Sequence, residues 1–119
     1  MNLLDTRVLP GAAMSLPDEF RVVVSDGERG TLVVPHGELD IATAPDLEAV
    51  LASQTGYVVI DLRRLSFVDA AGLHVLADAD ERSGQDGPGV SFIPGEAVRR
   101  LIECAGVPLR LTYTDPPAR

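Results

Sequence analysis

The segment from Val58 to Leu76, VVIDLRRLSFVDAAGLHVL, constrains the fold of this chain more than any other part of it. Its apolar opening lacks polar alternation, which is typical of a strand covered on both faces. A short loop and Asp69 follow, and then a helix. Because a helix N-terminus carries free N–H groups and a partial positive charge, this order predicts a small, smooth helix start at the protein surface.

Strand and helix patterns alternate through the rest of the chain. A Gly-containing turn joins two apolar stretches at 20–25 and 31–37, which favours an antiparallel hairpin. Further strands are predicted at 57–61, 90–93 and 109–113, and helices from Thr43 to before Gly56, from about 70 to 82, and from 95 to 105. A hairpin followed by β-α repeats predicts the α/β class: a mixed central β-sheet with helices packed on it and right-handed parallel crossovers.

The helix ends carry recognisable signals. Thr43 is predicted to cap the first helix, with Asp46 in the reciprocal box position and Pro45 in the first turn. Asp69 is the predicted N-cap of the second helix, a role worth about 1 kcal/mol. The apolar arc of the third helix includes Cys104, so we expect that thiol to be a buried packing group.

Length and charge limit the organisation and the partners. The chain of 119 residues fits one domain, whose core must be aliphatic because Trp is absent and Tyr and Phe are few. We expect a flexible N-terminal extension at 1–18, the folded domain at 19–113 and a C-terminal tail at 114–119. The net charge of −8 and the pI near 4.5 argue against nucleic acid; they are consistent either with a cationic or mixed protein surface as partner or with solubility alone.

Several site classes find no support in the residue pattern. With Cys104 as the sole cysteine there is no internal disulfide, and no CxxC or His/Cys cluster predicts a metal or another cofactor. Neither His36 nor His74 has a nucleophile or paired carboxylates at a catalytic spacing, so an enzyme is not expected. The N-terminal segment resembles neither a signal peptide nor a membrane span, which predicts a cytoplasmic protein. The oligomeric state stays open.

The predicted site is the start of the second helix. No hydroxyl, thiol or imidazole occurs at Ala70, Ala71 or Gly72. Glycine within a helix costs about 0.5–1 kcal/mol relative to alanine, so Gly72 serves either close packing on the sheet or close approach of a partner. The turn GELD, which ends at Asp40, is a candidate neighbour of this helix start. The candidate partner-binding residues are Asp40, Asp69, Ala70, Ala71, Gly72, Leu73 and His74.

Three segments in this order, GELDIATAPDL, VVIDLRRLSFVDAAGLHVL and GVSFIPGEAVRRLIECAGV, give the chain a resemblance to the STAS domain. The chain is similar to the free-standing bacterial anti-sigma factor antagonists of that family. In such antagonists the second helix begins Asp-Ser-Ser-Gly or Asp-Thr-Ser-Gly, and a kinase-type anti-sigma factor phosphorylates the first hydroxyl. The unphosphorylated antagonist binds that factor and releases the sigma factor.

On this chain the resemblance places Asp69 and Gly72 on the family pattern, with Ala70 at the phosphoacceptor position and Ala71 at the second hydroxyl position. Because alanine has no oxygen to accept a phosphoryl group, the implied protein is a non-phosphorylatable, antagonist-like interaction module that binds a kinase-type anti-sigma factor. Two alternatives remain: an adaptor or scaffold of a transporter or signalling complex, and a small-ligand sensor using the groove near GELD. Modification at Ser66 is a further hypothesis.

Overall fold

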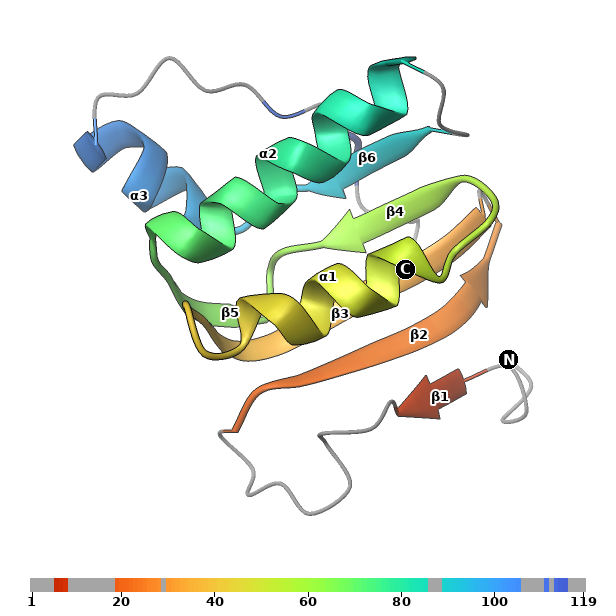
Figure 1. Cartoon of the computed structure of the whole chain (residues 1–119), viewed down its shortest axis with the longest axis horizontal. Coiled ribbons are helices and arrows are strands. Elements are labelled where there is room, and N and C mark those ends of the chain that lie inside the picture. The colour runs from red at the N-terminus through yellow and green to blue at the C-terminus, as the bar shows by residue number, and fades with distance from the viewer. Residues whose placement is uncertain are drawn as a thin grey trace.

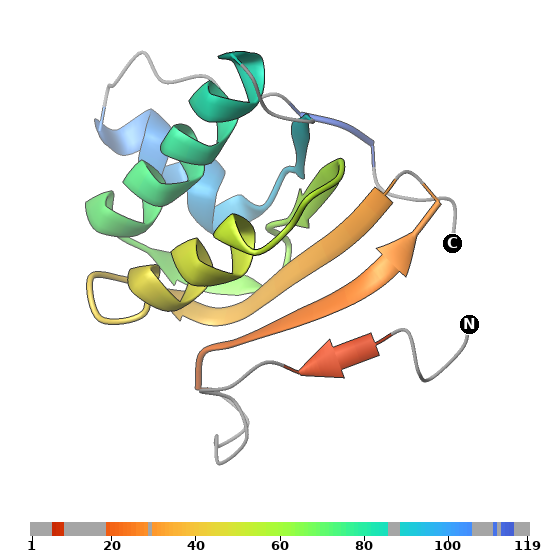
Figure 2. The same cartoon turned by 45° about the vertical axis from the view of Figure 1, so that its right-hand side comes forward.

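A mixed β-sheet runs through the molecule, with helices α1 (Ala44–Ala52) and α2 (Ala70–Gln85) lying side by side on one of its faces (Figures 1 and 2). The computed structural model describes residues 6–8, 19–28, 30–85, 89–105, 111 and 113–115. Within these residues the strand order is β1-β2-β3-β4-β6, and β5 also pairs with β3. The sheet is mixed because the first three strands are antiparallel and the later ones are parallel to β3 or β4.

Strands β2 (Arg21–Gly27) and β3 (Gly30–Leu39) form an antiparallel hairpin. Its strands pair from Arg21↔His36 to Gly27↔Gly30, as the two apolar stretches predict. Alternate residues of β2 are buried, since one face of the hairpin packs beneath the helices. A further strand, β1 (Thr6–Val8), pairs with β2. It lies in the segment we expected to be an extension, and the rest of 1–18 falls outside the described residues.

Strand β3 is long enough to pair with two successive strands on the same edge. Its first part pairs with β4 (Val58–Asp61), and its last part with β5 (Leu65–Val68). Within the β3–β5 ladder the register shifts between Gly37 and Glu38, and the φ of Gly37 is +98°. We expected a loop where β5 forms. A four-residue strand with only its end residues buried gives too weak a period-2 pattern to be distinguished from a loop.

Strand β6 (Val90–Ile93) completes the parallel part of the sheet beside β4. Helix α3 (Glu96–Ala105) follows it and packs against β5. The last predicted strand, 109–113, is represented by one parallel bridge between Phe92 and Tyr113, and its other residues lie mainly outside the described part. The α/β class and the mixed sheet with an N-terminal hairpin and β-α repeats are confirmed.

The core between the sheet and the helices is aliphatic, with one phenylalanine at its centre. The largest side chains that are almost wholly inaccessible come from β3, α1, β4, the segment after β4, α2 and β6: Leu39, Leu47, Ile60, Leu62, Leu76, Phe92 and Ile93. Cys104 is not among them, and the prediction that it is buried is wrong: the thiol is exposed. The apolar arc of α3 is wider than the face that β5 covers, and Cys104 lies on the uncovered side, near the end of the helix.

Candidate functional site

The carboxylate of Asp69 joins the start of α2 to the loop that follows β3. Its Oδ1 accepts the Gly72 N–H at 3.0 Å, which confirms the predicted N-cap. Its Oδ2 accepts the Ile41 N–H at 3.2 Å. The Asp69 N–H in turn donates to the Leu39 carbonyl at 3.1 Å. The GELD segment and the start of α2 are therefore neighbours, as the sequence suggested.

A second set of hydrogen bonds fixes the loop between β3 and α1. Asp40 Oδ1 accepts the N–H groups of Ala42 and Thr43, both at 3.0 Å. The Thr43 hydroxyl accepts the Asp40 N–H at 2.9 Å and donates to the Glu38 carbonyl at 2.8 Å. The predicted box between Thr43 and Asp46 is wrong, because Thr43 makes no side-chain cap on α1. The reciprocal hydrogen bonds instead join Asp40 and Thr43, three residues before the predicted position, in the loop that precedes α1.

This rigid loop holds Ile41 in solvent. The side chain of Ile41 is 76% exposed, whereas burial of such a side chain is worth about 1.5–3 kcal/mol. Ala70 and His74 on α2 are exposed as well, and Ala71 is half-buried. We call these residues, with the exposed Ala42, the α2 tip surface: Ile41, Ala42, Ala70, Ala71 and His74. It is a small apolar surface at a helix N-terminus, bordered by the carboxylates of Asp40 and Asp69.

Two of the candidate partner-binding residues face inward instead. Gly72 and Leu73 are both buried. A Cβ at Gly72 would lie 2.6 Å from Leu39 Cγ and 2.6 Å from the Leu39 carbonyl oxygen. Of the two explanations for Gly72, the structure therefore supports close packing on the sheet. Asp40, Asp69, Ala70, Ala71 and His74 lie at or near the surface, where contact with a partner is geometrically open.

The sequence reasoning missed Ile41. The available signal was a bulky apolar residue directly after the turn GELD. Leu47 and Val50 already account for the buried face of the following helix α1, so Ile41 was left without a place in the core. One of the hydrogen bonds that fix this loop, from the Ile41 N–H to Asp69, joins residues 28 positions apart. A pattern confined to neighbouring residues does not reveal that bond.

The described residues show no candidate metal site. They contain no group of three or more His, Cys, Asp or Glu side chains that could hold a metal ion. In the part of the chain that the structure describes, no helix is both long enough and apolar enough to cross a membrane. The side chain of Ser66, the alternative modification position, is exposed on β5.

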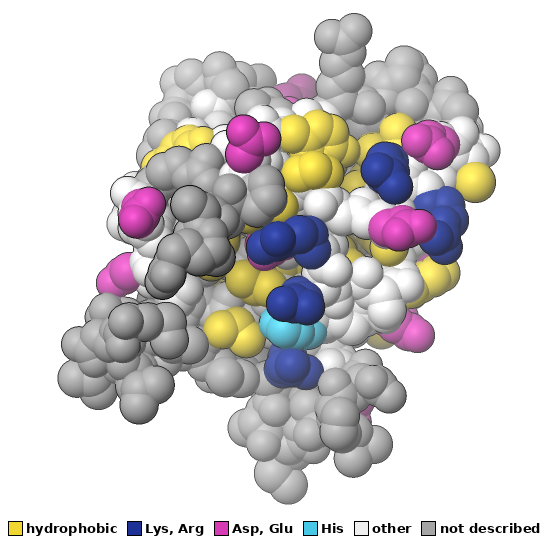
Figure 3. Space-filling model, turned by 180° about the vertical axis from the view of Figure 1, so that it is seen from behind, with side chains coloured by type: hydrophobic (Ala, Val, Ile, Leu, Met, Phe, Trp, Pro, Cys, Tyr) yellow, Lys and Arg dark blue, Asp and Glu magenta, His cyan; other side chains and the backbone are white. Residues whose placement is uncertain are grey.

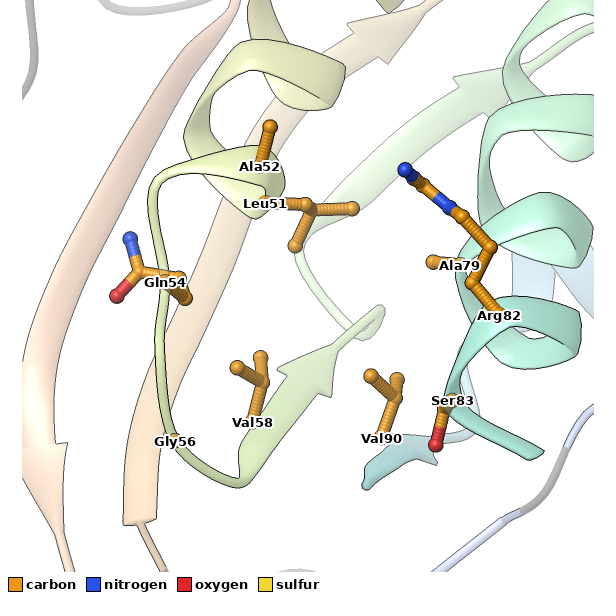
Figure 4. A pocket seen from close by; sticks show the side chains of 9 residues that line it. All are labelled: Leu51, Ala52, Gln54, Gly56, Val58, Ala79, Arg82, Ser83 and Val90. Atoms are coloured by element: carbon orange, nitrogen blue, oxygen red, sulfur yellow. The ribbon is translucent and has the colours of Figure 1, made fainter. Parts of the chain in front are cut away.

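Two shallow hollows are present, and neither is lined by a residue of GELD, although β5, which lines the second, pairs with Glu38 and Leu39. One of about 210 Å³ opens between the carboxyl ends of α1 and α2, with Leu51, Ala79 and Val90 in its wall and Arg82 at its side (Figure 4). The other, of about 220 Å³, lies between β5 and α3 and is lined by Phe67, Leu101 and Cys104 among others. Small-molecule sites usually measure about 300–1,000 Å³, so neither hollow favours the ligand-sensor hypothesis.

The mixed sheet and its helices give the chain the fold of the anti-sigma factor antagonist SpoIIAA in its unphosphorylated form. The two structures superpose with a TM-score of 0.58 at 18% identity, over 82% of this chain and 88% of that chain, a likeness that concerns the fold alone. The model of the family described as Mlab, STAS domain matches residues 22–108. The chain belongs to the STAS domain family.

More similar relatives are known from mycobacteria. The anti-sigma-F factor antagonist RsfB of Mycobacterium tuberculosis is 34% identical over 98 residues, which cover 79% of this chain and 80% of RsfB. The crystal structure of an anti-sigma factor antagonist from Mycobacterium paratuberculosis matches with a TM-score of 0.64 and 33% identity, over 78% of this chain and 83% of that chain. The resemblance inferred from three sequence segments is thus confirmed.

Proposed function

We propose that this protein is an anti-sigma factor antagonist that docks on a kinase-type anti-sigma factor through the α2 tip surface and is not phosphorylated there. It acts as a cytoplasmic regulatory module of transcription rather than as an enzyme. The observation that carries the proposal is the pairing of relatives named as anti-sigma factor antagonists with an exposed, hydroxyl-free helix start at Ala70.

The geometry of the tip supports docking. Ile41 provides an aliphatic anchor on a loop that is already ordered by Asp40, Thr43 and Asp69, so little conformational entropy is lost when a partner covers it. Ala70 and Ala71 are short enough to let a partner backbone approach the free N–H groups of α2. Gly72 and Leu73, being buried, act on docking only by shaping the tip.

The chemistry at residue 70 determines how such docking is regulated. A phosphoryl group at this position would add about −1.5 to −2 charges next to the partner. The helix N-terminus would stabilise that charge by up to about 2 kcal/mol, so the penalty would fall on the complex and not on the fold. Alanine has no oxygen for this reaction. Regulation then depends on protein level, on competition, or on modification elsewhere.

The test uses kinase-fold anti-sigma factors purified from the same organism. Isothermal titration calorimetry should find one that binds the wild-type chain, and radiolabelled ATP should leave the chain unlabelled. The Ala70→Ser variant should become labelled and should lose affinity once labelled. If no kinase-fold factor binds, or if the wild-type chain is labelled at the α2 tip, the proposal fails.

A matched pair of variants tests the surface itself. Ile41→Asp should weaken binding by about tenfold or more, because it places a charge in the apolar contact without altering the core. Ala49→Asp makes the same change of charge at an exposed position of α1, away from the tip, and should leave binding unchanged. Equal affinities for Ile41→Asp and the wild type would show that docking occurs elsewhere.

A further inference from the structure

A row of basic side chains crosses the face of the sheet opposite α1 and α2. Figure 3 shows arginines and a histidine in line on this face; the chain contains no lysine. Arg21 on β2 and His36 on β3 are directly paired across the hairpin, and Arg21 Nη2 lies 3.2 Å from His36 Nδ1. Arg64 follows β4, and its carbonyl accepts the Gly37 N–H at 3.3 Å. We call Arg21, His36 and Arg64 the basic row.

The protonation of His36 follows from this geometry. A guanidinium only donates hydrogen bonds, so Nδ1 of His36 must accept the bond from Arg21 and carries no proton in this arrangement. Burial lowers the pKa of His36, and so do the charges of Arg21 and Arg64, against the opposing effect of Asp61. His36 is therefore a neutral ring held between two cations.

Asp61, whose charge opposes those of the arginines at His36, is already paired. Asp61 is buried, and both of its oxygens bind the Arg63 side chain, at 3.0 Å to Nε and 2.8 Å to Nη2. This two-oxygen geometry is the preferred way in which arginine binds a carboxylate. At His36 the charges of Arg21 and Arg64 outweigh that of Asp61, although the chain as a whole carries −8.

The spacing of the row suits an extended acidic segment. Neighbouring strands are about 4.8 Å apart, so the row, which starts on β2 and crosses β3, spans roughly 10 Å at the backbone. Side chains on one face of an extended peptide repeat every ~6.8 Å. Carboxylates two and four residues apart in such a peptide are about 7 and 14 Å apart, which brackets the span of the row, so the flexible arginine side chains can each reach one carboxylate with His36 between them. The rest of this acidic surface would repel the same peptide, which favours binding at the row.

We propose that the basic row binds an acidic polypeptide segment of a protein partner, with carboxylates engaging Arg21 and Arg64 across His36. The site is separate from the α2 tip surface, since it lies on the opposite face of the sheet, and it does not depend on the proposed function. Nucleic acid is the less favoured polyanion because the net charge of −8 opposes its continuous phosphate backbone.

The experiment uses the two histidines as internal probes. A blocked hexaglutamate peptide is titrated into the ¹⁵N-labelled full-length chain, and the imidazole resonances are followed by NMR at low salt. The His36 signals should shift saturably, and the bound peptide should raise the pKa of His36, while His74 on α2 stays unchanged. Added salt should weaken the binding. An unshifted His36, or equal shifts at His74, would overturn the proposal.

Variants and other anions make the test specific. Arg64→Gln should reduce peptide affinity roughly tenfold, and Arg64→Lys should fall between it and the wild type, because it keeps the charge but loses the two-oxygen geometry. Arg82→Gln, which removes an arginine from α2, is the matched control and should have no effect. If inorganic phosphate shifts His36 as strongly as the peptide, the row holds an adventitious ion only. If an oligonucleotide binds more tightly than the peptide, the class of partner is wrong.

Discussion

Replacement of Gly72 by alanine tests how the α2 tip is held on the sheet. The new methyl carbon would lie 2.6 Å from both Leu39 Cγ and the Leu39 carbonyl oxygen, and 3.0 Å from Val68 Cγ2. The Leu39 side chain is inaccessible to solvent, and its carbonyl accepts the Asp69 N–H. Neither group can move away without disturbing the core or the helix start.

Two opposing effects set the magnitude. Alanine improves helix propensity by about 0.5–1 kcal/mol over glycine. Adding a methyl group to a packed core costs about 1–3 kcal/mol, and contact with an immobile carbonyl places this site in the upper part of that range. The net expectation is a loss of about 1–2 kcal/mol. For a domain of this size that corresponds to a fall in Tm of about 4–8 °C.

The assay is thermal unfolding followed by circular dichroism, with Gly56→Ala as the matched control. A Cβ at Gly56 meets no atom within 4 Å, and that glycine is not among those with positive φ. Gly56→Ala should leave Tm unchanged or raise it slightly, because it reduces the entropy of the unfolded chain. If Gly72→Ala is as stable as Gly56→Ala, close packing is not the reason for the glycine.

Three further predictions concern other described residues. Asp69→Ala should lower the free energy of unfolding by about 1–2 kcal/mol, because it removes the α2 cap and the hydrogen bond from Ile41. Asp69→Asn should retain most of this stability. Equal losses for the two variants in urea titrations would contradict the capping role. Burial raises the pKa of Asp61, but the hydrogen bonds and the charge of Arg63 outweigh burial and hold the pKa below the usual 3.8. The ion pair therefore stabilises the fold at pH values above 3.8. This stabilisation is lost as the pH falls through the pKa that Asp61 has in the folded protein. Tm should therefore fall more steeply between pH 5 and pH 3, about the range for a carboxyl group, in the wild type than in Asp61→Asn, and parallel curves would refute this. Native Cys104 should react with a thiol reagent at a rate within about tenfold of the unfolded chain, and strong protection would contradict its exposure.

The elements that sequence predicts well here are those whose signals are local. The hairpin, β4, β6 and the three helices each show an apolar run or an amphipathic period with glycine or proline at the ends. The Asp69 cap also needs only residues within one helical turn. These features determine the fold class and the position of the α2 tip, which is why the family resemblance could be inferred from three segments.

The features that sequence did not predict depend on distant residues. Strand β5 exists because the end of β3 offers it a free edge, and nothing within Leu65–Val68 reveals that partner. Cys104 lies on the apolar arc of α3, but that helix packs mainly on β5 and leaves part of the arc in solvent. The basic row combines β2, β3 and the turn after β4, so residues 21, 36 and 64 meet only in the folded sheet.

The four residues Asp69, Ala70, Ala71 and Gly72 divide their roles between the fold and the surface. Asp69 caps the helix and Gly72 is buried against Leu39, so the fold constrains both. Ala70 is exposed, and replacing it by serine would change helix propensity by only about 0.5 kcal/mol. Stability therefore gives little reason to prefer alanine over serine at residue 70. The difference between a phosphorylatable and a non-phosphorylatable tip acts on the partner, and the Ala70→Ser variant isolates that difference without disturbing the core.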